Sequence, residues 1–222
     1  MVKVRRVIKI GLALLTILAA LCAIAAVVAV RSSRKTEHEA QMFLQEFVSL
    51  HLGQSTFEDA RQVADRYGDR LWVGDAFYGH ALRLPGAGGL PPGCSADHCD
   101  YLFEFQNTWL HRLHLARFTS FGAEIKIRNG LVVIRSIEFL VVRGQLIFFA
   151  AVVEDSTDKL RRPLPSRRLK AKTIIWLTAE STAAERQQSF AFNLECLSKI
   201  GGCKDSFELL PGPWPDDNAF MK

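Results

Sequence analysis

The apolar run Ile10–Val30 constrains the fold of this 222-residue chain more than any other feature of its sequence. Thr16 is the only notable polar residue in the run. At a rise of 1.5 Å per residue, a helix over these residues is about 31 Å long, which matches the hydrocarbon core of one bilayer. The run therefore predicts a single transmembrane helix over residues 10–30, with the rest of the chain folding outside the membrane.

A cleavable signal peptide is the main alternative, because Ala23-Ile24-Ala25 offers an A-x-A cleavage site. The apolar region of a signal peptide is about 7–15 residues long, however, and here it continues to Val30. Lipoprotein processing at Cys22 is disfavoured, since Leu21 stands where a small residue is needed. The pattern favours a retained signal-anchor.

Basic residues are concentrated around the apolar run. No acidic residue occurs before Glu37, and in the rest of the chain acidic residues slightly outnumber basic ones. The basic residues of this first part are Lys3, Arg5, Arg6, Lys9, Arg31, Arg34 and Lys35. The whole-chain pI of about 9.1 therefore reflects the membrane flanks, and a nucleic-acid partner is not expected.

The cysteines outside the run form two local pairs, Cys94 with Cys99 and Cys196 with Cys203. Such pairs are typical of disulfides formed in an oxidising compartment. The flank before the run is also slightly more basic than the flank after it, which favours a cytoplasmic N-terminus. We therefore predict a single-pass protein of the cell membrane, with residues 1–9 as a cytoplasmic basic tail and the C-terminal domain extracytoplasmic.

Two helices are predicted after the span. Residues 31–53 form a juxtamembrane amphipathic helix with Phe43, Phe47 and Leu50 on one face, and its pattern allows it to continue the membrane helix directly. Ser55 and Glu58 have capping-box spacing for a second helix. The apolar face of that second helix consists of Phe57, Ala60, Ala64 and Tyr67.

Strands are predicted from alternating apolar residues. These are residues 101–106, a strand starting near Ala123, and residues 131–142, 146–153 and 172–178. Asn129-Gly130 is a strong hairpin signal between the second and third of them. The expected fold class is α+β: the transmembrane helix, then a helix pair packed on a four- to five-stranded antiparallel meander. The domain is expected over residues 54–210, followed by a Pro-rich tail over 211–222.

Several predicted strands are apolar on both of their faces. Examples are Leu131-Val132-Val133-Ile134 and Leu146-Ile147-Phe148-Phe149. Neither face of the sheet is then expected to be simply solvated. The two helices could cover one face, and the Cys196–Cys203 segment, a second copy or a partner could cover the other. Cover by the chain itself is favoured.

No residue pattern supports an enzyme. The motifs H-E-x-x-H, G-x-S-x-G and G-x-x-x-x-G-K-[ST] are absent from the sequence. His98, His111 and His114 are low-probability metal candidates, because His111 and His114 would share one side of a helix but no third ligand is fixed by spacing. Four cysteine ligands are disfavoured too, since neither cysteine spacing is that of a usual zinc knuckle. No cofactor is expected.

A cluster of cations precedes the last predicted strand. It consists of Lys159, Arg161, Arg162, Arg167, Arg168, Lys170 and Lys172. We interpret it as a solvated connection between strands. The alternative is an anion contact to lipid headgroups or an acidic polymer, because clustered cations near a membrane contribute about 1 kcal/mol each.

The order of anchor, helix, Gly53-x-Ser-Thr-Phe-Glu-Asp, second helix and Tyr67-Gly68 resembles small envelope domains of the SmpA/OmlA and β-lactamase-inhibitor-protein type. The resemblance implies two helices paired with a sheet, and a role in binding other proteins. It carries over no functional residue. A pilin-like protein would share the apolar helix and a C-terminal cysteine loop, but with Gly11 as the processing glycine Thr16 stands where pilins need glutamate.

These observations favour a membrane-anchored extracytoplasmic binding or structural protein, with an envelope protein or a second copy of the chain as partner. The alternatives are a metal-dependent envelope enzyme using His98, His111 and His114, and an anionic lipid or polymer binder using the basic segment 159–172.

Overall fold

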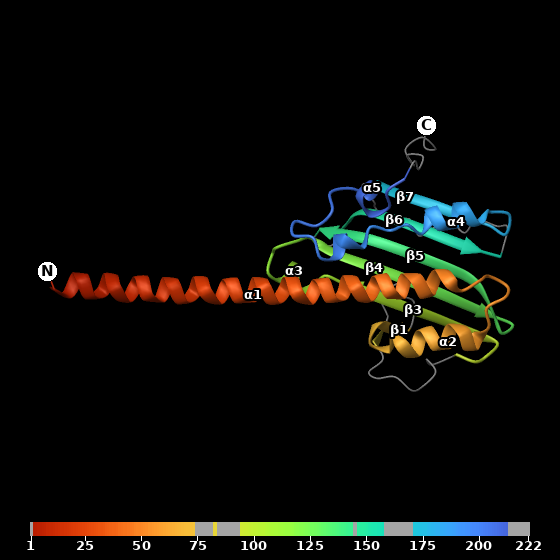
Figure 1. Ribbon diagram of the computed structural model, residues 1–222, viewed down its shortest axis with the longest axis horizontal. Coiled ribbons are helices and arrows are strands. Elements are labelled where there is room, and N and C mark those ends of the chain that lie inside the picture. The colour runs from red at the N-terminus through yellow and green to blue at the C-terminus, as the bar shows by residue number, and fades with distance from the viewer. Residues whose placement is uncertain (1, 74–81, 84–93, 144–145, 158–170, 213–222) are drawn as a thin grey trace.

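The computed structural model of the protein describes residues 2–73, 82–83, 94–143, 146–157 and 171–212. The chain has the predicted α+β class, with one long N-terminal helix and a sheet that carries shorter helices (Figure 1). The elements with two to four residues are the 3-10 turns η1, Gly68–Arg70, and η3, Leu194–Leu197, the strands β1, Leu71–Val73, and β2, Leu82–Arg83, and helix α5, Ser206–Leu209.

Helix α1, Val2–Ser49, is continuous through the apolar run and the amphipathic segment. Within the described residues it is the one helix long and apolar enough to cross a membrane. Its two halves differ in burial, because the side chains of residues 10–24 are exposed whereas one stripe of the second half is buried. The stripe steps alternately by four and three residues, as one face of a helix does, and consists of Ala29, Ser33, Thr36, Ala40, Phe43 and Phe47. Leu50, the residue after the helix, continues it.

The sheet has the strand order β2-β1-β3-β4-β5-β6-β7. Its main strands are β3, His98–Gln106; β4, Phe118–Arg128; β5, Leu131–Arg143; β6, Leu146–Ser156; and β7, Ala171–Leu177. Neighbours are antiparallel except for β7, which runs parallel to β6. The five main strands agree with the predicted four or five, but the prediction that all of them are antiparallel is wrong. Residues 157–170 join β6 to β7, and a connection of that length can return to the start of the sheet as a parallel crossover requires.

The predicted hairpin between β4 and β5 is confirmed. Arg128 pairs with Leu131, and the two residues between them, Asn129 and Gly130, have φ values of 53° and 75°. Positive φ at both positions is the geometry of a type I′ turn, which asparagine and glycine tolerate best. The turn thus fixes the register of the two central strands.

Helix α2, Phe57–Arg66, begins one residue later than predicted. Thr56, not Ser55, is the N-cap, and its side chain forms a capping box with Asp59. The backbone explains the shift, because the carbonyl of Ser55 accepts from Val132 N–H at 2.9 Å while the Ser55 hydroxyl accepts from His51 N–H. Ser55 is therefore engaged in the connection to β5.

The core lies on one face of the sheet, between the strands and the helices (Figure 1). Phe43 of α1 packs against Phe103 and Phe105 of β3, with ring centroids 4.7 and 5.2 Å apart. Phe192, in the segment after helix α4, Ala183–Ser189, packs against Phe121 and Phe139 on the same face. Helix α1 and the C-terminal segments thus cover this face together, and we call it the covered face.

The Cys196–Cys203 segment also belongs to this core, since Cys196, Leu197 and Cys203 are buried in the same cluster as Phe43. The expectation that this segment covers the second face of the sheet is therefore wrong. Its cysteine side chains point into the layer that α1 already occupies. What covers the second face must be sought elsewhere.

Candidate functional site

The second face of the sheet, opposite α1, is formed by the side chains that alternate with the core residues of each strand. We call it the open face. Its described members are Asp100, Leu102, Glu104, Gln106, Phe118, Ser120, Glu124, Lys126, Arg128, Ile134, Ser136, Glu138, Leu140, Val142, Ala150, Val152, Glu154, Ser156, Ile174 and Trp176. The core side chains of α1, α2 and α5 join the cluster on the covered face. Helix α3, Thr108–Arg112, contacts one end of the open face, where His111 packs against Phe118 with ring centroids 5.5 Å apart.

The open face has a polar half on β3 and β4. Arg128 pairs with Asp100 at 2.6 Å, Lys126 pairs with Glu124 at 2.9 Å, and the Ser120 hydroxyl donates to Glu104 at 2.6 Å. Among the described members of the face carboxylates outnumber cations, because Glu138 and Glu154 lie on β5 and β6. The described part of the open face is therefore acidic.

The side chain of Glu124 is 14% exposed, whereas that of Asp100 is 38% exposed. Burial raises the pKa of Glu124 above its ordinary value, against the opposing effect of the Lys126 ammonium. The Ser136 hydroxyl also lies 3.4 Å from Glu124. A carboxyl group held in this way at the centre of a sheet face is costly to desolvate further, so a ligand that covers it has to supply a hydrogen bond or a positive charge.

The other half of the open face is apolar. Leu140 and Val142 of β5 and Ile174 and Trp176 of β7 are half-buried there. An apolar centre next to charged residues is the arrangement found in protein–protein interfaces, in which aromatic residues are enriched. The open face thus combines both chemistries that recognise another protein surface.

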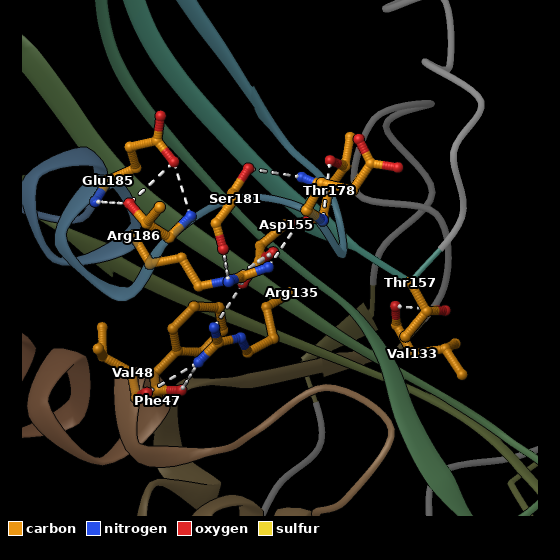
Figure 2. A network of polar contacts seen from close by, with 12 residues as sticks. Phe47, Val48, Val133, Arg135, Asp155, Thr157, Thr178, Ser181, Glu185 and Arg186 are labelled. Carbon is orange, nitrogen blue, oxygen red and sulfur yellow. Dashed lines mark hydrogen bonds and ion pairs between the residues drawn. The ribbon is translucent and has the colours of Figure 1, made fainter.

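A buried network of charges lies beneath the end of α1 (Figure 2). Arg135 of β5 and Asp155 of β6 are cross-strand partners, with side chains 3% and 0% exposed, and Arg135 Nη2 donates to Asp155 Oδ2 at 2.6 Å. The other terminal nitrogen, Nη1, donates to the carbonyls of Phe47 at 3.2 Å and Val48 at 2.8 Å. One guanidinium therefore joins α1 to two strands.

The position of Arg135 suits the end of a helix. The last carbonyls of α1 have no partner within the helix and carry its negative partial charge, so a cation there is favourable. The guanidinium also lies over the ring of Phe190, 5.3 Å from its centroid, and 6.0 Å from that of Phe47. Burial lowers the pKa of Arg135, and Asp155 opposes that shift. Arginine nevertheless stays protonated in proteins.

Arg186 of α4 completes the network on the other side of Asp155. Its Nε donates to both carboxylate oxygens, at 3.3 and 3.2 Å, and its terminal nitrogens donate to the carbonyls of Ser181 and Thr178. Asp155 is thus shared by two guanidinium groups (Figure 2). Every one of these contacts fixes the position of a structural element, so we interpret the network as a latch between α1, the sheet and α4.

The predicted cysteine pairs are at disulfide distance. The Cα atoms of Cys94 and Cys99 are 4.4 Å apart, and those of Cys196 and Cys203 are 5.3 Å apart. Within the described residues Cys22, exposed on α1, is the one free cysteine. The first bridge joins Cys94, which precedes β3, to Cys99 in that strand. The second bridge joins Cys196 in the turn η3 to Cys203.

The three histidines named as metal candidates are not brought together. His98 begins β3, whereas His111, in helix α3, Thr108–Arg112, and His114 follow the other end of that strand. A strand of this length places its ends about 26 Å apart. Among the residues that the structure describes, no group of three histidine, cysteine or acidic side chains could hold a metal ion.

The basic segment lies outside the described residues, because residues 158–170 and the side chain of Lys172 are not among them. This applies to Lys159, Arg161, Arg162, Arg167, Arg168, Lys170 and Lys172. Its interpretation as a solvated connection or an anion contact stays a prediction. Most of the Pro-rich tail, residues 213–222, lies outside as well.

The latch is the site that the sequence predictions missed. Two signals could have found it: single charges of opposite sign, Arg135 and Asp155, at core-facing positions of neighbouring strands, and the capping-box spacing of Thr182 and Glu185 at the start of α4. Neither charge alone is unusual in a long strand. Only the register of β5 against β6 makes them partners.

Comparison with known proteins finds no matching family model, no matching curated protein and no matching solved structure. The resemblance to small envelope domains therefore stays a prediction.

Proposed function

We propose that this chain is a single-pass membrane protein of the cell envelope whose extracytoplasmic domain binds another protein through the open face. The observation that carries the proposal is the one-sided cover of the sheet: α1, α2 and the C-terminal segments all pack on the covered face. In this proposal α1 and α2 act as the helix pair that closes that face. The open face is left for a partner.

The chemistry of the open face describes the surface that would fit it. Leu140, Val142 and Trp176 supply apolar area, and the carboxylates of Asp100, Glu104 and Glu124 on β3 and β4 supply negative charge beside it. A partner with an apolar centre and a basic rim would complement both. The acidic character also disfavours a bare lipid or nucleic-acid surface as the ligand of this face.

The orientation of the open face relative to α1 indicates where a partner would be located. The main strands run lengthwise beside α1 rather than across its end (Figure 1). If α1 crosses the membrane, both sheet faces then stand upright on the bilayer and the open face looks sideways. A partner anchored in the same membrane could then contact the open face from the side, while its own anchor stays in the bilayer.

The latch supports this function by holding the domain in one orientation. α1 is one uninterrupted helix from the apolar run to Ser49, and Arg135 binds its last turn to β5 and β6. A rigid joint of this kind keeps the open face at a fixed height and angle over the membrane. A flexible linker would let it sample all directions.

Site-specific photocrosslinking in native membranes tests the proposal. A photoreactive phenylalanine derivative would replace Ser136 or Leu140 of the open face, with exposed Gln62 of α2 as the matched position on the other side. We expect light-dependent adducts of one defined mass at Ser136 and Leu140, and none at Gln62. An adduct of twice the chain mass would identify the partner as a second copy, whereas absence of any adduct at both open-face positions would contradict the proposal.

A further inference from the structure

The end of the domain nearest the N-terminus meets α1 inside its apolar run. Ala29 is 0% exposed and Ser33 is 2% exposed, and Ala25 and Ala26 are half-buried. Helix α3 lies beside α1 at this end of the sheet (Figure 1). Because each residue adds 1.5 Å, Ala29 lies within about 2 Å of the end of the apolar run along the helix axis. The domain therefore begins where the span ends, with no spacer between them.

Exposed apolar side chains gather at this end. Trp109 and Leu113 are 49% and 39% exposed and lie one turn apart, since Leu113 N–H donates to the carbonyl of Trp109. Ile200, in the Cys196–Cys203 segment, is 62% exposed, and Gly201 N–H donates to the carbonyl of Leu115 at 2.8 Å. That hydrogen bond holds the two exposed segments against each other.

The same segments are fastened to α1. The Ser198 hydroxyl donates to the carboxylate of Glu37, two turns beyond Ala29 on the helix. Gly202 has a φ of 69° and lies beside Arg117, since an added Cβ would be in ordinary van der Waals contact with its backbone nitrogen at 3.7 Å. The exposed apolar groups are therefore held at a fixed level on α1, not carried on a free loop.

Cations lie at the same end of the domain as these apolar groups. Arg31 and Arg34 are exposed on the first turns of α1 after the run, and the Arg112 guanidinium lies 5.6 Å from the ring centroid of Trp109. In the described part of the chain, no carboxylate is within ion-pair distance of these three arginines. Tryptophan and arginine beside the end of an apolar span are the residues that membrane proteins place in the headgroup layer.

We infer that Trp109, Leu113, Ile200, Arg31, Arg34 and Arg112 form a collar that lies in the phospholipid headgroup layer around α1. The apolar side chains enter the boundary between headgroups and acyl chains, and the arginines bind lipid phosphates. The inference rests on the membrane anchoring in the proposed function, and it adds a second contact to the same bilayer. The collar and the latch together would fix the domain at both ends of its contact with α1.

The alternative occupant of this surface is another protein. Lipid and protein as occupants predict different behaviour in a vesicle that contains only the full-length chain and lipid. Lipids brominated near the headgroup end of their acyl chains quench tryptophan fluorescence on contact. The variant Trp109→Phe removes the reporter while keeping an aromatic ring, and Trp176→Phe removes a tryptophan from the open face. Native disulfides and a native circular dichroism spectrum would confirm that each variant is folded.

Cys22 gives an independent reading of the anchor in the same vesicles. It lies near the middle of the apolar run and is the free thiol of the described chain. A water-soluble maleimide cannot reach it inside a bilayer but labels it in denatured protein. Its protection therefore reports insertion of α1, separately from the position of Trp109.

We expect Cys22 to be protected, and the quenched fraction of the fluorescence to fall by more than half in Trp109→Phe but not in Trp176→Phe. Equal quenching in the original chain and in Trp109→Phe, with Cys22 protected, would overturn the collar and leave the anchoring intact. Labelling of Cys22 in intact vesicles would overturn the anchoring and the collar with it. As a second test of the same surface, Ile200→Asn should lower the quenching of Trp109 because it removes an apolar contact at the same level.

Discussion

The covered and the open face are built by the same five main strands, but their side chains are of different kinds. On β3 the covered face carries Cys99, Tyr101, Phe103 and Phe105, whereas the open face carries Asp100, Leu102, Glu104 and Gln106. The charges of the covered face, Arg135 and Asp155, neutralise each other in the latch. The open face carries charge pairs that are partly exposed, such as Arg128 with Asp100.

This difference shows what two-sided apolarity in a strand means here. β5 and β6 are apolar on both faces, yet the described helices cover only one of them. On the second face of these strands Ile134, Ala150 and Val152 are themselves buried, but they lie outside the cluster to which the helices contribute. Substitutions on the two faces should therefore differ in what they change: stability on the covered face, and binding on the open face.

The largest effect is expected from Asp155→Ala. It leaves Arg135 and Arg186 facing each other without a counter-charge, and removing one partner of a buried ion pair costs about 3–5 kcal/mol. Denaturant unfolding of the full-length chain in detergent would measure the loss. The matched substitution on the open face, Asp100→Ala, breaks an ion pair that is about one-third exposed and should cost about 1 kcal/mol or less. Similar losses at both positions would contradict the distinction.

Ala40→Leu should have the next largest effect. Ala40 is fully buried in the stripe of α1, and added methyl groups in a packed core cost about 1–3 kcal/mol. On the open face, Ser136→Leu adds a similar volume where no described element packs, and its effect should lie within about 0.5 kcal/mol. The same unfolding assay compares the two variants, and a larger loss from Ser136→Leu would reverse the assignment of the faces.

Thr182→Ala should destabilise the protein by about 1 kcal/mol, because it removes the N-cap of α4, the helix that carries Arg186 of the latch. Thr182→Ser keeps the hydroxyl and should restore most of the loss. If the alanine and serine variants had the same free energy of unfolding in urea, the side-chain cap of α4 would contribute nothing to stability.

The pH dependence of stability should separate Glu124 from Asp59. The pKa of Glu124 is raised by burial, so as pH rises above the ordinary glutamate value the unfolded state loses its proton first and stability falls. Glu124→Gln, which cannot titrate, should gain stability relative to the original chain between pH 4 and pH 7. The pKa of Asp59 is lowered by the backbone N–H of Thr56, so its contribution is present above the ordinary aspartate value and is lost in acid. Asp59→Asn should therefore lose stability relative to the original chain as pH rises towards about 4, and should show little further change above that. Changes of the same sign for the two variants would be inconsistent with these environments.

Local patterns predicted much of this structure. The Asn129-Gly130 turn, the alternation in β3 and β4, and the core positions Phe43, Phe47, Ala60 and Ala64 follow from short-range rules that depend on neighbouring residues alone. The cysteine pairs were predicted for the same reason, since both close short loops. Each of these features is decided within a few residues of the chain.

The features that could not be predicted depend on contacts between distant segments. β7 pairs parallel with β6 because the chain crosses over between them, and nothing in residues 171–177 distinguishes that from a hairpin return. The latch joins residues 47, 135, 155 and 186, and its geometry exists only once β5 and β6 are in register. Likewise, the sequence could show that a second face needs cover, but not that the Cys196–Cys203 segment would pack on the first.

The most direct test of the two-face account is the accessibility of a single thiol in place of Ser136, at the centre of the open face. Ser136→Cys is close in size to the original residue, and a membrane-impermeant maleimide reports whether water reaches it. The account predicts rapid labelling in the purified protein and at least tenfold slower labelling in intact native membranes, where the partner is bound. Equal labelling rates in both preparations would show that nothing covers the open face in the membrane, and would contradict the account.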